Sequence, residues 1–386
     1  MVMAIAFFVI VVGSVVFHFL SPWWLTELAS NWSRMDDMLT ITLVITGAFF
    51  VVINLFVVYT LLKFRHRAGR RAAYQPENKR LERWLIGVTT VGIIALLAPG
   101  LAVYASYVQP PGDALLLEVV GQQWQWRYRF VGASDKLGAS DARFVSGSNP
   151  LGLDPGDPSG RENIVVVGNE VHLPLNRPVK VLARSHDVLH DFFVPPMRAR
   201  MNIVPGQVSS FWFTPTRAGR YEAMCAQLCG IGHANMRGTV VVEDEAAFQA
   251  WLKSQPTFAA SQMPAPAATT GAAAAGGAAA NPVDQGKSLA QTKGCVACHS
   301  IDGAAGVGPT WKGLFGKSET MADGTAVLVD EAALKLDIRD PQARIVKGFP
   351  PIMPKQELSD DELEALVSYI KTLSAAPGGA ATAVRK

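Results

Sequence analysis

The chain has 386 residues, 49% of them apolar, and a formal net charge of only +3 at pH 7. This length allows two or three domains. So small a charge, with no cluster of Lys and Arg on a soluble element, argues against nucleic-acid binding, and we expect no nucleic-acid partner. The apolar residues concentrate in long runs near the N-terminus, which is typical of a membrane protein that carries soluble domains.

Three apolar runs are long enough to consider as membrane helices. The second and third, residues 39–62 and 84–107, contain no charged side chain, and a spanning helix needs about 20 apolar residues. We therefore predict a transmembrane hairpin over residues 39–107 that lies in a lipid bilayer. The first run, residues 1–20, is either an extra uncleaved helix or a secretory signal. It has no Lys or Arg before its apolar core, which favours the helix.

The connection between the two hairpin helices is strongly basic. Its acidic residues are Glu77 and Glu82, against Lys63, Arg65, Arg67, Arg70, Arg71, Lys79, Arg80 and Arg83. By the positive-inside rule this connection lies in the cytoplasm. Everything after Tyr107 is then predicted to be extracytoplasmic.

Beyond residue 111 the pattern changes to short strands, which we assign to a soluble domain over residues 112–254. Residues 115–130 alternate and would place Trp124, Trp126, Tyr128 and Phe130 on one face. Further strands are predicted at residues 164–167, 179–183, 208–213 and 239–242. Short strands separated by Gly/Pro turns predict a β-sandwich or barrel. The polar residues 134–162 are expected to form a surface loop.

A metal-binding pattern occurs near the end of this domain. Cys225, Cys229, His233 and Met236 fall within twelve residues, and thiolate, imidazole and thioether together favour copper. His190 is the best additional imidazole, because we expect it to end a strand before an apolar turn. Zinc would leave Met236 unused, and a disulfide between the two cysteines is possible in an exported domain. Both alternatives stay open.

Residues 255–281 are mostly Ala, Gly, Pro, Ser and Thr, a composition typical of a flexible tether. A helix is predicted from Asp284 to Lys293, and a capping box at Ser359 predicts another that ends near Leu373. We therefore expect a separate small helical domain at residues 282–376.

This helical domain contains the sequence Cys295-Val-Ala-Cys298-His299, which is the attachment motif of a c-type haem. A redox-active Cys-x-x-Cys is the alternative, but the following histidine and the absence of a βαβ pattern favour haem. His299 would be the proximal iron ligand. Met353, in a proline-rich turn before the last helix, is the preferred sixth ligand, and Met321 is its competitor.

The chain from the transmembrane hairpin to about Glu243 resembles subunit II of the haem–copper cytochrome c oxidases. The resemblance rests on Gln123-Trp124-Gln-Trp126-Arg-Tyr128, on Asp187-Val-Leu-His190, on Val194-Pro195, on Pro205-Gly206 and on the cysteine loop. It implies a cupredoxin-like domain with two copper ions bridged by both thiolates. His190 and His233 would be the terminal ligands, and Met236 and the backbone carbonyl of Gln227 the weak axial ligands. Asp187 would orient a ligand imidazole, whereas His172 and His186 fall outside the ligand pattern.

In two places the chain departs from that family. The family usually has carboxylates where this chain has Asn202 and Gln227, and they support a magnesium or manganese ion between this subunit and the catalytic one. A hard dication prefers anionic oxygen, so two amides put the ion in doubt.

Residues 282–373 resemble class I cytochromes c, with Pro309 expected to support His299. Together the two resemblances suggest the fused subunit II of caa-type oxidases: a multidomain protein with a transmembrane α-hairpin, a cupredoxin-like sandwich and a small all-α cytochrome c domain. They imply electron transfer from haem c to the copper pair and on to the oxygen-reducing subunit I of a proton-translocating oxidase. The donor would be an external cytochrome or a quinol-oxidising complex. The expected location is the bacterial inner membrane, with both redox domains in the periplasm.

Two rivals remain, a quinol oxidase subunit, which would lack the copper ligands, and a membrane-anchored copper-delivery protein. The resemblance also gives roles to two further residues. Trp124 is predicted to be an exposed aromatic on the electron path. Glu82 is predicted to lie at the mouth of a proton-uptake channel, with a solvated surface charge as the alternative.

Overall fold

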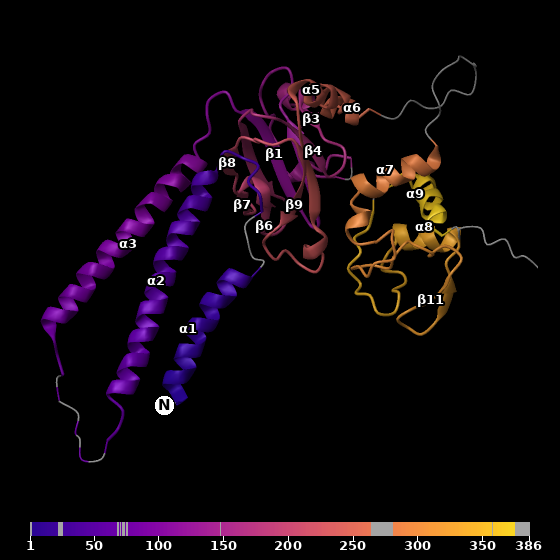
Figure 1. Ribbon diagram of the computed structural model, residues 1–386. Coiled ribbons are helices and arrows are strands. Elements are labelled where there is room, and N and C mark those ends of the chain that lie inside the picture. Colours follow the sequence, from indigo (N-terminus) through magenta and orange to yellow (C-terminus); the bar gives the residue numbers. More distant parts are fainter. Residues whose placement is uncertain are drawn as a thin grey trace, which may run out of the picture. The chain divides into compact units, whose positions relative to one another are not determined.

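The computed structural model describes residues 2–21, 26–67, 69, 71, 74, 76–146, 148–263, 281–356 and 358–374 (Figure 1). The chain divides into two units: Met1–Pro111 with Pro196–Arg198, and Gly112–Pro195 with Ala199–Lys386. The second unit contains the strand domain and the helical C-terminal domain.

Three long helices make up most of the first unit, α1 (Val2–Leu20), α2 (Ser33–Lys63) and α3 (Lys79–Tyr107). Each is long and apolar enough to cross a membrane. α1 contacts α2, and Ala4 and Val11, one heptad apart, are buried. α2 begins six residues before the apolar run at 39, because its first turn is polar and carries Asp36, whose charge suits a helix N-terminus.

Two five-stranded sheets form the strand domain, which has the predicted cupredoxin-like fold. One sheet has the order β3-β2-β1-β5-β8 and the other β4-β10-β9-β6-β7. Most neighbours are antiparallel, but β1 with β5 and β4 with β10 are parallel. The strands are β1 (Leu115–Gln122), β2 (Gln125–Phe130), β3 (Ile164–Val165), β4 (Glu170–Pro174), β5 (Val179–Ser185), β6 (His190–Val194), β7 (Ala199–Ile203), β8 (Ser209–Phe213), β9 (Gly219–Cys225) and β10 (Arg237–Glu243).

The first predicted strand is a hairpin rather than one continuous strand. β1 and β2 pair with Gln122 opposite Gln125, so Gln123 and Trp124 form the turn. Trp126, Tyr128 and Phe130 face the core and are almost completely buried, as the alternation predicted. Trp124 does not share that face, because it belongs to the turn and is only half-buried.

Residues 134–162, which we expected to be a surface loop, pack on the sandwich. They contain the short helices η1 (Ala142–Phe144) and α4 (Pro158–Glu162). Leu151 and Leu153 are buried with Val120 of β1 and with Phe258. The segment is therefore part of the domain's hydrophobic core.

A buried ionic cluster attaches residues 134–162 to the strands of the sandwich. Arg129 and Arg184 both bind the carboxylate of Glu118, and their other hydrogen bonds go to Gly138, Leu151 and Asn163. Burial by itself would raise the pKa of Glu118, but the two guanidinium groups outweigh it and lower that pKa.

The start of the predicted tether at 255–281 is folded. After α5 (Glu245–Ser254), Thr257 pairs with Ile164 and the helix α6 (Phe258–Ser261) inserts Phe258, which is only 3% exposed, into the core. The strand domain therefore continues past residue 254. Residues 264–280 of the predicted tether lie outside the described residues.

The C-terminal domain is helical, as predicted, with α7 (Pro282–Thr292), η4 (Cys295–Ala297), α8 (Glu331–Arg339) and α9 (Asp360–Thr372). A two-stranded ribbon, β11 (Ser318–Thr320) with β12 (Ala326–Leu328), accompanies the helices. Ser359 and Glu362 form the predicted capping box at the start of α9. α7 and α9 cross closely at Gly286, which has no side chain. A Cβ on Gly286 would lie only 2.0 Å from the carbonyl oxygen of Ala365.

Candidate functional site

The cysteine loop connects two neighbouring strands, and their pairing determines where its side chains lie. Cys225 ends β9, and its backbone N–H donates to the carbonyl of Met236, which directly precedes β10. His190 begins β6, next to β9, rather than ending a strand as we predicted. Strand pairing thus brings residues 190, 225 and 236 together although they are far apart in sequence.

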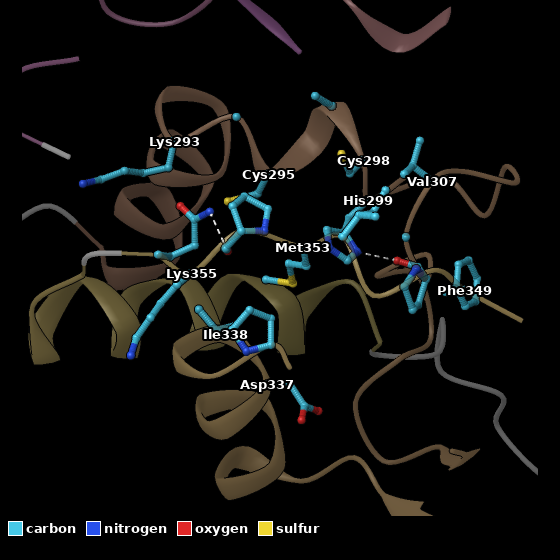
Figure 2. Close-up of a pocket in the computed structure, with 18 of the residues that line it drawn as sticks. Lys293, Cys295, Cys298, His299, Val307, Asp337, Ile338, Phe349, Met353 and Lys355 are labelled. Carbon is cyan, nitrogen blue, oxygen red and sulfur yellow. Dashed lines mark hydrogen bonds between the residues drawn. The ribbon is translucent and has the colours of Figure 1, made fainter. Parts of the chain in front are cut away.

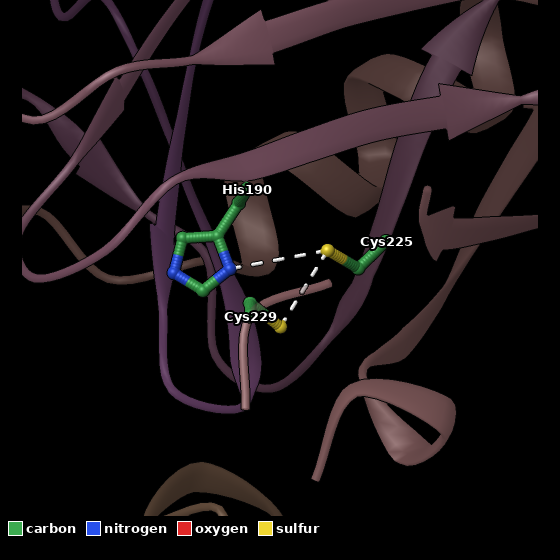
Figure 3. A group of neighbouring side chains, drawn as sticks. All are labelled: His190, Cys225 and Cys229. Carbon is green, nitrogen blue, oxygen red and sulfur yellow. Dashed lines mark hydrogen bonds between the residues drawn. The ribbon is translucent and has the colours of Figure 1, made fainter. Parts of the chain in front are cut away.

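All six predicted copper ligands meet in this region. The two cysteine Sγ atoms are 3.7 Å apart, and both cysteines are free. His190 Nδ1 lies 3.9 Å from Cys225 Sγ, and His233 Nδ1 lies 3.6 Å from Cys229 Sγ. Figure 3 shows the His190 ring directed toward the sulfur of Cys225. Met236 Sδ is 3.9 Å from Cys229 Sγ, and the carbonyl oxygen of Gln227 is 3.1 Å from Cys225 Sγ. Two thiols, two imidazoles, a thioether and a carbonyl oxygen form a donor set that fits copper.

The two ring nitrogens of His190 have different partners. Nε2 donates to Asp187 Oδ1 at 2.8 Å, which leaves Nδ1 directed at the thiols. Asp187 also accepts from the backbone N–H of Gln123 at 2.7 Å. Burial by itself would raise the pKa of Asp187, but these hydrogen bonds lower it, so the carboxylate stays ionised and fixes the imidazole.

The surroundings of the two cysteines affect their thiol pKa values differently and favour the thiolate form of Cys225. Burial raises the pKa of a thiol, but the neighbouring His190 imidazole lowers the pKa of Cys225 to about 6. The pKa of Cys229 is raised by burial and by the nearby charge of Cys225. The lowered pKa of Cys225 favours the thiolate, which is the form in which cysteine binds a metal.

Trp124 packs directly on this loop. Its Nε1 donates to the carbonyl of Cys229 at 3.2 Å, and its ring covers Gly232, where a Cβ would lie 2.3 Å from Cδ2. Gln123 donates to the same carbonyl at 2.8 Å. We had not predicted a role for Gln123 or Gly232. The Gly-Ile-Gly sequence before His233 was the available signal, since glycine permits such close approach.

His172 and His186, which fall outside the predicted copper-ligand pattern, do not join the cysteine loop. His172 is in β4, stacks on Trp251 at 4.3 Å and contacts Glu243 and Glu170 at 2.7 and 3.1 Å. His186 is in the turn after β5, and burial lowers its pKa. Glu82 is exposed in the first turn of α3.

The haem motif lines a pocket of the C-terminal domain (Figure 2). Cys295, Cys298, His299 and Met353 all contribute to its wall, with Trp311 and Ile338 among the apolar residues. Figure 2 shows the Met353 side chain inside the pocket, in view between Cys295 and His299. Met321 also lines the pocket and is buried, in a bridge with Val346. An apolar pocket with these donors on its wall fits a haem.

His299 is held from three sides. Its Nδ1 donates to the carbonyl of Pro309 at 2.8 Å, its ring stacks on Trp311, and Gly308 faces it so closely that a Cβ would lie 2.6 Å from Cε1. Burial lowers the pKa of His299, which favours the neutral imidazole. The hydrogen bond to Pro309 leaves Nε2 as the nitrogen available to iron.

Comparison with known proteins agrees with the interpretation of both the strand domain and the C-terminal domain. Residues 115–244 match the family model "Cytochrome C oxidase subunit II, periplasmic domain", and residues 283–374 match the model "Cytochrome c". The chain is 49% identical over 259 residues to the alternative cytochrome c oxidase subunit 2 of Bradyrhizobium diazoefficiens, which covers 67% of this chain and 94% of that relative. The chain belongs to the cytochrome c oxidase subunit II family.

Two further likenesses are weaker. Cytochrome c oxidase subunit 2 of Cereibacter sphaeroides is 29% identical over 224 residues, which cover 55% of this chain and 72% of that relative. A crystal structure of the periplasmic domain of cytochrome oxidase subunit II from Bradyrhizobium japonicum matches 38% of this chain and 96% of its own, with 24% identity and a TM-score of 0.27. The family assignment stands without that structural match.

Membership of the subunit II family has direct consequences. The chain is a membrane-anchored subunit of an oxidoreductase complex, has a periplasmic domain, and works with other oxidase subunits. The subunit II domain implies copper-A and the cytochrome c domain implies haem. The fusion of these two domains fits a caa-type subunit II.

Proposed function

We propose that this subunit takes up electrons for a terminal respiratory oxidase, passing them from haem c to a binuclear copper-A centre and on to the oxygen-reducing subunit I. The observation that carries the proposal is the convergence of two thiols, two imidazoles and a thioether beside one carbonyl oxygen. The donor would be an external cytochrome or a quinol-oxidising complex, and the complex would lie in the bacterial inner membrane.

In this proposal Cys225, Cys229, His190 and His233 would hold two copper ions. Met236 and the backbone carbonyl of Gln227 would be weaker ligands. When bound, each redox group accepts and releases one electron. The chain's contribution is rigidity, because β-strand pairing and the Asp187–His190 hydrogen bond hold the ligands before and after each transfer.

In the C-terminal domain Cys295 and Cys298 would form two thioether bonds to the haem. His299, through Nε2, and Met353 would hold the iron. Histidine and methionine together give a high haem potential. Pro309, Trp311 and Gly308 fix the orientation of His299.

We assign further roles to Trp124 and Glu82. Trp124 would lie on the electron path, because its indole contacts the loop through the Cys229 carbonyl. Glu82 would admit protons to subunit I from the cytoplasmic end of α3, consistent with its place at the end of the basic connection.

The proposal can be tested in the intact oxidase with Cys229→Ser. A hydroxyl is a poor bridging ligand, so the mixed-valence copper EPR signal should disappear. Haem c should still be reduced by the donor, but its reoxidation by oxygen should stop, as stopped-flow absorption would record. Reoxidation at the wild-type rate would contradict the proposal.

Treatment of the oxidase with a copper chelator tests the rival function, copper delivery. A delivery protein holds its copper in an exchangeable form, so a copper chelator would remove the ion within minutes. The copper-A proposal predicts that the chelator leaves the signal unchanged and that two coppers are bound per chain.

A further inference from the structure

Asp191, the residue after His190, is an acidic residue in an unusual place. It is 1% exposed, and its Oδ2 accepts from Arg200 Nε at 2.8 Å. Its Oδ1 has no hydrogen-bond partner among the residues that the structure describes. Burying a carboxylate is costly unless a positive charge compensates it. Arg200 supplies that charge from the neighbouring strand β7.

Asp191 is close to both places where the chain departs from its family, because Asn202 lies opposite it and Gln227 follows a residue that is bonded to its backbone. Asn202 is directly opposite Asp191 in the register of β6 and β7. Side chains that face each other in this way leave the same side of the sheet, with Cβ atoms about 5 Å apart. On the other side Ala226, the neighbour of Gln227, donates its backbone N–H to the Asp191 carbonyl at 3.0 Å.

These residues do not fit the magnesium or manganese ion that the family resemblance implies. Asn202 and Gln227 offer only neutral amide oxygens, whereas such dications prefer carboxylates. The remaining carboxylate, Asp191, already faces a guanidinium. A second positive charge beside Arg200 would be repelled.

We propose that the guanidinium of Arg200, held against Asp191, replaces the divalent cation at this face, so that the assembled oxidase carries no magnesium or manganese ion there. The Arg200 side chain is 57% exposed, so its charge is still presented to a covering subunit. Its guanidinium also lies over the ring of Phe193 at 5.6 Å, which limits its freedom. This inference rests on the proposed role as an oxidase subunit.

The first test is a metal count on the intact oxidase purified from cells grown with excess manganese. We expect the mixed-valence copper signal and no stoichiometric Mn²⁺, either by metal analysis or as a six-line EPR signal. One manganese per copper-A centre would overturn the inference. Loss of the copper signal would instead count against the proposed function, and the manganese count would still decide this inference.

The second test removes the guanidinium with Arg200→Met, in parallel with Arg237→Met as the control. Arg237 pairs with Glu222 on the same sheet, but both side chains are about half exposed. Arg200→Met should lower the thermal midpoint of the oxidase by several degrees and let it bind one Mn²⁺, which should restore part of the loss. Arg237→Met should do neither.

Wild-type stability without bound manganese in Arg200→Met would overturn the inference. If the oxidase with Arg200→Met does not assemble, the manganese content of the Arg200→Lys variant tests the inference instead. Lysine retains the positive charge, so the oxidase should assemble and remain free of manganese. One bound manganese in Arg200→Lys would contradict the inference.

Discussion

The two redox domains hold their ligands in different ways. In the strand domain the donor atoms of His190, Cys225 and Cys229 lie within 4.8 Å of one another, in a sandwich whose core also contains many aromatic and aliphatic side chains. In the C-terminal domain the motif residues line a pocket, and its wall includes core residues such as Trp311 and Ile338.

The difference has an energetic consequence. The sandwich buries Trp126, Tyr128, Phe130 and Phe192 through strand packing, so it should remain folded without copper. The C-terminal domain has a much smaller core, arranged around the pocket. Its stability should therefore depend on the group that fills the pocket.

The largest expected effect follows from removing both thioether attachments with Cys295→Ala and Cys298→Ala. Covalent haem, measured by peroxidase staining on a denaturing gel, should fall to zero. The C-terminal domain should become susceptible to proteolysis, because its pocket loses the haem. The matched pair Cys225→Ala and Cys229→Ala should lose copper but leave the sandwich protease-resistant. Equal protease resistance of the two domains in these variants would contradict the proposed difference in their stability.

A smaller effect is expected from Glu118→Gln, which leaves Arg129 buried without its counter-charge. Breaking such a buried pair costs about 3 kcal/mol of the free energy of unfolding. The folded pKa of Glu118 is below its ordinary value of 4.5, so its stabilisation is complete above that pH and is lost as the pH falls through the folded pKa.

Denaturant unfolding of the strand domain at pH 7 and at lower pH measures this contribution. The gap between wild type and Glu118→Gln should close on acidification. Glu222→Gln, which removes an exposed pairing with Arg237, should cost under about 1 kcal/mol and serves as the control. A pH-independent gap would show that Glu118 acts through packing alone.

Trp124→Ala should have the smallest effect, because no metal ligand is removed. Electron transfer from haem c to copper should slow about tenfold, equivalent to about 1.4 kcal/mol of activation free energy. The copper spectrum should not change. Trp124→Phe keeps an aromatic ring without Nε1–H and should recover most of the rate, while Trp212→Ala on β8 serves as a control. An unchanged rate in folded Trp124→Ala would remove Trp124 from the path.

Local patterns were sufficient where the interactions are close in sequence. The apolar runs of α2 and α3, the motif from Cys295 to His299, and the capping box at Ser359 each depend on residues that are close together in the chain. The alternation of Trp126, Tyr128 and Phe130 also predicted which side chains β2 buries. The spacing of Cys225, Cys229, His233 and Met236 reflects a single loop, so its donor set could be read directly from the sequence.

Only the tertiary structure decided what depends on contacts between distant segments. The β1–β2 hairpin moved Trp124 from the buried face to the cysteine loop, because a two-residue turn interrupts the alternation. The buried Glu118 cluster made residues 134–162 part of the core despite their polar composition. Asp191 faces Asn202 because of the register between β6 and β7. The local sequence of either strand does not determine that register.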